Sequence, residues 1–378
     1  MMLRRITVEH RTPKIATAAG VADLARPKKT QLLAAIATLT LATTTACSTD
    51  NPNNSPKINP PAPKTAAALP GTPQQASIAP APPISEAEAA STSKSYFDLS
   101  KKARAERDVK TLGSIESGIL LEISTARLER ILKYGDNIGN DEDLAANSDI
   151  KAISPQGAPA GSDRWLLSTG RQTIGKQSRG SLGVLRQTQG VGPWKMSFLA
   201  FTNVGQDFPA ISQIATTDSS TSADPAKIYY GEDICRDFAS YIDGGPTQTS
   251  WGPRAKAVIQ SAQKDKQDAG SLTNGGTISV KTEVREDDRV PAWSTSDGGK
   301  LVMCTTKTTS SLSSGSSTPI TITKSQSFQN LNGRTTRWKS LDLVNVGMTV
   351  FKIPPSATQA VDIIADSVRS LSADGTPA

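Results

Sequence analysis

Histidine is almost absent from this chain, whose 378 residues include only His10, close to the N-terminus. If residues 1–46 are a cleaved leader, the mature protein contains no histidine. That absence excludes Ser-His-Asp and Cys-His nucleophile pairs, zinc sites that use histidine, and a histidine general base. The motifs G-x-x-x-x-G-K-[ST] and G-x-S-x-G are also missing. Any catalysis would therefore depend on carboxylates, lysine, tyrosine or serine.

Long apolar runs are lacking as well. The run at residues 32–42 is interrupted only by Thr38 and Thr40, and it is too short for a membrane-spanning helix, which needs about 20 apolar residues. Lys28 and Lys29 precede this run, and small residues follow it up to Ala46. A positive segment, a short apolar core and a small residue at the cut are typical of a secretory signal peptide. We expect residues 1–46 to be that peptide.

The residue after the expected cut is Cys47. This arrangement resembles the lipobox of bacterial lipoproteins, and its threonine-rich form, with Thr44 where that family prefers leucine, resembles actinobacterial versions. The resemblance implies a diacylglycerol thioether on Cys47 and a protein anchored to the outer face of the bacterial cell membrane. The alternative is an ordinary secretory cut near Ala46 followed by an incidental cysteine.

The excess of positive charge comes largely from the leader. The chain carries 42 Lys and Arg against 35 Asp and Glu, a net charge of +7. Residues 1–46 hold seven of the bases and two of the acids, which leaves 35 bases and 33 acids, or +2. Such a near-neutral mature chain argues against a nucleic-acid partner.

Cysteine is scarce too. Apart from Cys47, the chain has only Cys235 and Cys304. In an oxidising compartment an even pair is a candidate disulfide, although spacing alone does not prove the bond. The alternative is that each is buried separately as a small hydrophobic residue.

Residues 47–84 have the composition of a disordered, Pro-rich linker. Ten of the 24 prolines fall here, and large apolar residues are nearly absent. Such a segment cannot bury enough surface to offset the entropy of ordering. We expect it to hold the folded part away from the bilayer.

The remainder is predicted to be α+β, in two lobes at residues 85–215 and 216–378. Helical spacing comes first in each lobe, beginning in the first with a capping box from Ser85 to Glu88 and continuing in residues 124–134. Alternating strand patterns follow, most regularly from Ile278 to Val284. A final helix is expected from Ser356, with an apolar stripe through Val361, Ile364, Val368 and Leu371. The order resembles two tandem cones of the cystatin and nuclear-transport-factor-2-like (NTF2-like) superfold.

A repeated phrase favours duplication of one module. Trp194-Lys195 is followed by Asn-Val-Gly at residues 203–205, and Trp338-Lys339 by the same triplet at residues 345–347. We expect the two tryptophans to occupy equivalent strands.

Three segments carry a wider resemblance: GGKLVMCTTKTT (298–309), TTRWKSLDLVNVG (335–347) and VDIIADSVRSLSADG (361–375). They resemble an uncharacterised family of actinobacterial lipoproteins, classed as a domain of unknown function. The resemblance implies secretion, anchoring and an α+β fold, and it supplies no catalytic residues.

Three groups of side chains are candidate sites, and the first two have a structural alternative. Trp194 and Trp338 could line a ligand cavity or pack in the core. Tyr229, Tyr230, Glu232 and Asp233 could form an acid–base cluster, or a strand end and the acidic first turn of a helix. Glu116 and Glu122, on either side of Gly118, could be paired carboxylates.

The sequence predicts no catalytic or metal-binding residue and no cofactor. We expect a non-catalytic binding or scaffolding protein of the cell envelope, with a wall component, an envelope protein or a small apolar ligand as its partner. The alternative is a histidine-independent enzyme that uses a carboxylate or tyrosine in a cone cavity.

Overall fold

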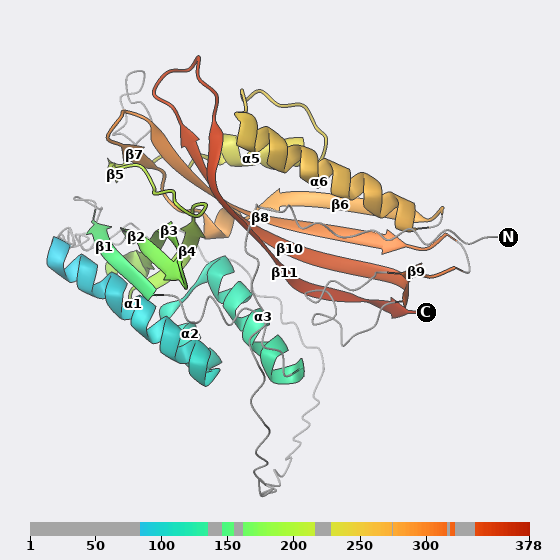
Figure 1. Ribbon diagram of the computed structural model, residues 1–378, viewed down its shortest axis with the longest axis horizontal. Helices are drawn as coiled ribbons and strands as arrows, with labels where there is room; N and C mark the ends of the chain where they lie inside the picture. The colour runs from blue at the N-terminus through green and yellow to red at the C-terminus, as the bar shows by residue number, and fades with distance from the viewer. Residues whose placement is uncertain are drawn as a thin grey trace, which may run out of the picture. The chain divides into compact units, whose positions relative to one another are not determined.

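The computed structural model describes residues 84–134, 146–154, 162–215, 228–273, 275–315, 318–321 and 337–378. The expected signal peptide, Cys47 and nearly all of the expected linker lie outside these residues. The fold is α+β, as predicted: helices precede antiparallel strands in both halves of the described chain (Figure 1).

Three helices open the first half: α1 (Glu86–Glu106), α2 (Val109–Ile115) and α3 (Gly118–Tyr134). The helix start at Ser85 is confirmed, since the Ser85 hydroxyl caps α1 by accepting a hydrogen bond from the Glu88 amide at 3.2 Å. Arg107, in the left-handed conformation with φ +58°, ends α1. Asp108 then caps α2 through the amide of Thr111 at 3.0 Å.

The first sheet is a four-stranded antiparallel meander in the order β1-β2-β3-β4. Its strands are β1 (Ala146–Ile153), β2 (Arg164–Ile174), β3 (Gln177–Gln187) and β4 (Lys195–Phe201). Residues 175 and 176 form the turn between β2 and β3, and Gly175 takes φ +58°, which a side chain would disfavour.

The second half begins with helices α5 (Glu232–Ile242) and α6 (Pro253–Leu272). A seven-stranded sheet accompanies them, and four of its strands form a second antiparallel meander, β6-β8-β10-β11. These are β6 (Thr277–Val284), β8 (Lys300–Ser313), β10 (Arg337–Ile353) and β11 (Asp362–Pro377). Three short strands complete the sheet: β5 (Ile211–Ile214), β7 (Trp293–Thr295) and β9 (Ile320–Thr321).

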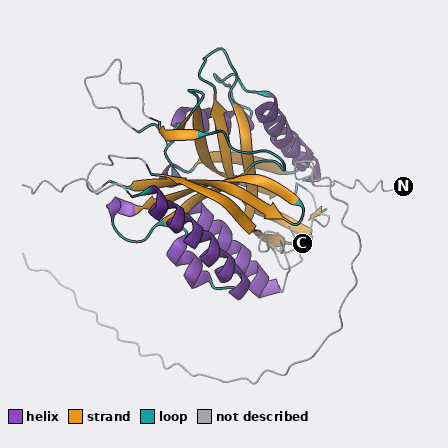
Figure 2. Ribbon diagram, turned by 60° about the vertical axis from the view of Figure 1, so that its left-hand side comes forward, coloured by secondary structure: helices purple, strands orange, loops and turns teal. Residues whose placement is uncertain are grey.

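The central strands of the second sheet are buried on both faces. Val302 and Cys304 of β8 pack with helices α5 and α6, whereas Leu301 and Met303 join the core shared with the first sheet. This double burial explains why residues 301–304 form a continuous apolar run. Figure 2 shows helices on the outer side of this sheet and the strands of the first sheet crossing its other side.

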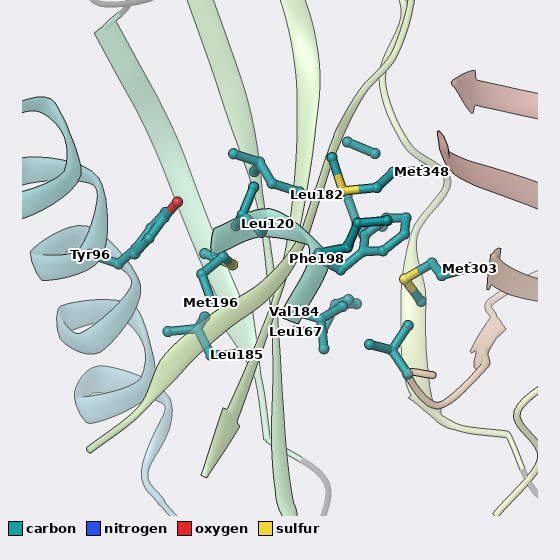
Figure 3. Close-up of a cluster of buried hydrophobic side chains, with 14 of the residues drawn as sticks. Tyr96, Leu120, Leu167, Leu182, Val184, Leu185, Met196, Phe198, Met303 and Met348 are labelled. Carbon is teal, nitrogen blue, oxygen red and sulfur yellow. The ribbon is translucent and has the colours of Figure 1, made fainter. Parts of the chain in front are cut away.

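One hydrophobic core connects the two sheets. Phe198 of β4 and Leu167 of β2 belong to the same buried cluster as Met303 and Met348 of the second sheet. Figure 3 shows the two methionines approaching Phe198 from the strands of the second sheet. In addition, β5, which falls within the predicted first lobe, pairs with β7 of the second sheet. The lobes therefore share both a core and a strand.

The predicted C-terminal helix is wrong, because residues 362–377 form strand β11. Ser356 does not begin a helix there: its hydroxyl accepts from the Thr358 amide at 3.4 Å, and its carbonyl from the Gln359 amide at 3.1 Å, within a turn. Strand β11 instead pairs with β10 from Trp338 to Lys352. The long neighbouring strand outweighs a helical apolar spacing that is rich in serine and aspartate.

The expected equivalence of the tryptophans is also wrong. Trp194 lies just before β4, the last strand of the first meander, whereas Trp338 lies near the start of β10, the third strand of the second. The Asn-Val-Gly triplet follows β4 in one case and lies inside β10 in the other. What the halves share is the order of helices followed by a four-stranded meander.

Candidate functional site

A crevice with a cavity volume of about 100 Å³ lies between helices α1 and α3 and strands from both sheets. Figure 1 shows the two helices and the strands of the second sheet that border this region. The lining side chains come from α1, α3, β1, β2, β4, β10 and β11. They are Tyr96, Phe97, Ser100, Lys101, Arg104, Leu120, Ile123, Ser124, Arg127, Arg130, Asn147, Gln172, Leu199, Phe201, Met348, Ser367 and Arg369.

Cations dominate the charged part of this lining. Helix α1 contributes Lys101 and Arg104, helix α3 contributes Arg127 and Arg130, and β11 contributes Arg369. Residues three apart lie on one face of a helix, which explains how each helix presents two cations to the same space. Among the described residues that line the crevice, none is aspartate or glutamate. The charged side chains of the lining are therefore all positive, which suits an anion.

Arg130 is bonded to the backbone of β11. Its Nη1 donates to the backbone carbonyl oxygens of Ser370 at 2.9 Å and Leu371 at 3.4 Å, on the edge strand β11. Burial, and then the neighbouring positive charge of Arg127, lower the pKa of the Arg130 guanidinium. Arg130 is thus held by neutral acceptors while a second cation repels it.

A sixth cation lies behind the crevice wall. The Arg179 side chain donates to Gln172 Oε1 from Nε at 3.0 Å and from Nη2 at 2.6 Å. Its guanidinium lies 4.2 Å from the centre of the Phe201 ring, within the range of a cation–π contact. Both Gln172 and Phe201 line the crevice, so Arg179 orients this wall and adds to its positive charge.

A buried carboxylate lies beside the crevice without lining it. Glu116 is 0% exposed; its Oε1 accepts from the Tyr96 hydroxyl at 2.9 Å and pairs with Arg104 Nη2 at 3.4 Å. Burial, and then the negative charge of Glu116, raise the pKa of Tyr96 well above its ordinary value. Tyr96 is therefore a neutral donor, and the group ties α1 to the end of α2.

Glu116 and Glu122 do not form the carboxylate pair that the sequence allowed. Glu122 instead accepts from Arg285, with distances of 2.9 Å to Oε1 and 3.1 Å to Oε2. The Arg285 guanidinium also pairs with Asp288 at 2.9 Å. A Cβ atom at Gly118, with φ +58°, would overlap the Asp288 carboxylate, so glycine permits this close packing between α3 and the second half.

The acidic residues near Tyr229 lie at a helix start and have partners within the protein. Glu232 and Asp233 occupy the first turn of α5, which confirms the helix-start interpretation. The Tyr229 hydroxyl donates to Asp233 at 2.7 Å, and Glu232 pairs with Arg289 at 3.3 Å. Each acid thus has a local partner at an exposed helix start.

The two candidate tryptophans belong to the core rather than to the crevice. Trp194 packs against the main hydrophobic cluster, and Trp338 is 4% exposed within a smaller cluster that includes Leu312, Ile320 and Leu341. Neither lines the crevice. Large aromatics used in this way contribute apolar burial to stability.

Cys235 of α5 and Cys304 of β8 form a disulfide, with a Cα–Cα distance of 5.4 Å. The bond links a helix to the second sheet inside a buried cluster. Elsewhere in the described part of the chain, no group of three His, Cys, Asp or Glu side chains is arranged to hold a metal ion. Within the same residues, no helix combines the length and apolar character needed to cross a membrane.

The sequence analysis missed the crevice. Arg127 and Arg130 were visible as cations three residues apart on an expected helix, but a charged helix face is usually solvated. The sequence did not indicate that these two arginines lie near Arg369, which comes about 240 positions later in the chain. That proximity depends on the unexpected strand β11.

Comparison with known families confirms one part of the resemblance, namely a domain of unknown function. A family described as a domain of unknown function (DUF8094) matches residues 80–375, and the chain belongs to this family. No curated protein and no solved structure matched.

Proposed function

We propose that this protein is a lipid-anchored, non-catalytic binding protein on the outer face of a bacterial cell membrane, and that it binds an anionic ligand in the basic crevice. The single observation that carries the binding role is the convergence of five cations without a lining carboxylate. Glu116 pairs with Arg104 behind the wall, whereas the positive charges of Arg127 and Arg130 repel each other. An anionic ligand would offset that repulsion.

The cellular setting rests on the sequence. The signal-peptide pattern and Cys47 support a diacylglycerol anchor, with residues 48–84 as the spacer, and the threonine-rich lipobox favours an actinobacterial lipoprotein. The disulfide is consistent with an oxidising compartment. An anionic wall component or an acidic segment of an envelope protein would satisfy the crevice, whereas nucleic acid would need a broader basic surface.

The tandem cystatin/NTF2-like interpretation is part of the proposal. In its favour, each half places helices before a four-stranded antiparallel meander. The crevice lies where elements of both halves meet. Its formation therefore requires both halves.

Anion binding can be tested with inorganic phosphate. At constant ionic strength, phosphate should raise the thermal midpoint of the parent chain, because it binds the folded state. The double variant Arg127→Gln/Arg369→Gln should lose this shift. Arg236→Gln, which removes an exposed cation of α5 that does not line the crevice, is the matched control. Equal shifts in all three proteins would contradict the proposal.

Anchoring can be tested independently by fractionation. The Cys47→Ser variant, expressed in an actinobacterial host, should move from the membrane fraction to the soluble extracytoplasmic fraction. A variant that remains as membrane-bound as the parent would exclude a lipid anchor on Cys47. This result has no bearing on the crevice, so the two parts of the proposal fail separately.

A histidine-independent enzyme is the second candidate, favoured by the burial of Glu116 beside Tyr96 and Arg104. Against it, Glu116 does not line the crevice, so its carboxylate has no access to a substrate there. In a strain with a measurable loss phenotype, Glu116→Gln should leave function intact. Complete loss of function in a stably folded Glu116→Gln protein, with phosphate binding retained, would favour the enzyme.

A further inference from the structure

The crevice is only partly a charged site. Its inner wall is apolar and comes from three elements: Leu120 and Ile123 of α3, Leu199 of β4 and Met348 of β10. Leu120 is 3% exposed and Met348 is 4% exposed, so their contact surfaces lie deep in the fold. A site for a free, fully hydrated anion would gain nothing from such a wall, because apolar surface favours apolar ligand atoms.

The cations, by contrast, extend to the outer part of the crevice. Lys101 and Arg369 are exposed residues that also line it, while Arg130 is fixed deeper by its hydrogen bonds to β11. Charge at the opening and apolar surface within the crevice match a ligand in which a charged group lies next to an apolar group.

Size limits how much of the ligand enters. The volume of about 100 Å³ is well below the roughly 300–1,000 Å³ of pockets that enclose a drug-sized molecule. It accommodates one small charged group with a few adjoining carbon atoms. The rest of a larger ligand would remain outside.

One polar group of the wall has an unmet hydrogen bond. Asn147 Oδ1 is buried and has no partner among the described residues. Buried polar atoms are normally paired, so a ligand hydroxyl or amide at this point would satisfy it. This observation is independent of the charge of the crevice.

We propose that the crevice binds an amphiphilic anion: a phosphate or carboxylate group joined to a short apolar chain. The inference rests on the proposed anion-binding function and specifies the class of ligand. Two sources share this chemistry, namely an anionic lipid in a bilayer and a soluble acid with an alkyl chain.

Calorimetric titration of the full chain tests the proposal with three probes. Octyl phosphate, used below its critical micelle concentration, has both parts; inorganic phosphate has only the head, and octyl glucoside has a chain without charge. Burial of two methylene groups predicts that octyl phosphate binds about 10-fold tighter than inorganic phosphate. Octyl glucoside should bind at least 10-fold more weakly than octyl phosphate.

Variants locate the site. Arg369→Gln removes an exposed charge from an edge strand and should weaken octyl phosphate binding several-fold without loss of fold. Ser367→Phe, which places a large side chain in the lining beside Met348 and leaves every charge in place, should reduce binding of both octyl phosphate and inorganic phosphate. Arg236→Gln should bind as the parent does. Unchanged binding in both Arg369→Gln and Ser367→Phe would overturn the assignment.

The outcomes separate this inference from the proposed function. If inorganic phosphate binds as tightly as octyl phosphate, the amphiphile proposal fails while anion binding stands; if neither anion binds, both fail. Equal binding of octyl glucoside would replace the proposal with a purely apolar site. Flotation with phosphatidylcholine vesicles, with and without phosphatidic acid, then distinguishes the sources. Recruitment only by phosphatidic acid, lost in Arg369→Gln, assigns a bilayer lipid, and octyl phosphate binding without recruitment assigns a soluble acid.

Discussion

Arg130 and Arg285 are part-buried arginines in opposite electrostatic surroundings. Arg285 has carboxylate partners in Glu122, Asp287 and Asp288, and hydrogen bonding to Glu122, the largest influence, raises its pKa. Arg130 has two backbone carbonyls as its acceptors, and burial together with Arg127 lowers its pKa. One arginine is surrounded by negative charge, and the other is next to a like charge.

The difference separates two uses of charge. The acids around Arg285 bring α3 together with the segment after β6, and the nearby disulfide ties α5 to β8. The positive charge of Arg285 is balanced by acids of the protein itself, and these ion pairs hold the elements together. In the crevice the charged side chains of the lining are all cations, and under the proposed function they would meet an anion from outside the chain.

Removal of the disulfide between α5 and β8 should give the largest loss of stability. Closing a loop between residues 69 positions apart stabilises a protein by about 4 kcal/mol in the chain-entropy model. The double variant Cys235→Ser/Cys304→Ser should lose about this free energy of unfolding, measured with denaturant. Its folded fraction should still bind phosphate, because neither cysteine lines the crevice. A loss below about 1 kcal/mol would show that the bond contributes little.

Replacing Arg285 and Arg130 separately with glutamine compares the contributions of the two sites to stability. Arg285→Gln leaves Asp288, whose side chain is 8% exposed, without its cation, and should cost about 2 kcal/mol, since the other two acids are solvated. Arg130→Gln removes hydrogen bonds to β11 but also a repelled charge, and should cost about 1 kcal/mol or less. Denaturation of both variants under the same conditions tests the order. The reverse order would contradict our distinction between the two sites.

Local structure was predictable where one segment contains its own signals. Ser85 and Glu88 announced the start of α1, and the alternation from Ile278 to Val284 predicted β6, which spans Thr277–Val284. In both cases the determining contacts lie within a few residues. The α+β order of elements followed from such signals.

What could not be predicted depends on distant partners. The segment from Asp362 has an apolar spacing compatible with a helix, and only pairing with the 17 residues of β10 makes it a strand. The crevice depends on that strand, because β11 brings Ser367 and Arg369 next to α3. Glu116 and Glu122 are close in sequence, yet Glu116 accepts from the buried Tyr96 and Glu122 from the distant Arg285.

Acid pH should lower the free energy of unfolding through Asp237 of α5. Although partial burial opposes its charge, hydrogen bonds from Thr247, Gln248 and Thr249 lower the pKa of Asp237 below its ordinary value. A lowered folded pKa stabilises the protein above the unfolded value, near 4, and that contribution is lost as the pH falls through the folded pKa. Between pH 5 and pH 3, the parent should therefore lose more stability than Asp237→Asn. Parallel pH profiles would exclude a contribution from Asp237.

The smallest effect is the most informative for the crevice. Arg127 lowers the pKa of Arg130 through charge repulsion, so Arg127→Gln should relieve that repulsion and stabilise the ligand-free protein by about 0.5 kcal/mol. The same substitution should weaken binding of phosphate, because it removes a cation from the lining. Thermal melts with and without phosphate measure both effects on one sample. Stability and binding that change in opposite directions identify a charge retained for a ligand. If Arg127→Gln destabilises the ligand-free protein and leaves binding unchanged, Arg127 serves the fold, and the contrast with Arg285 disappears.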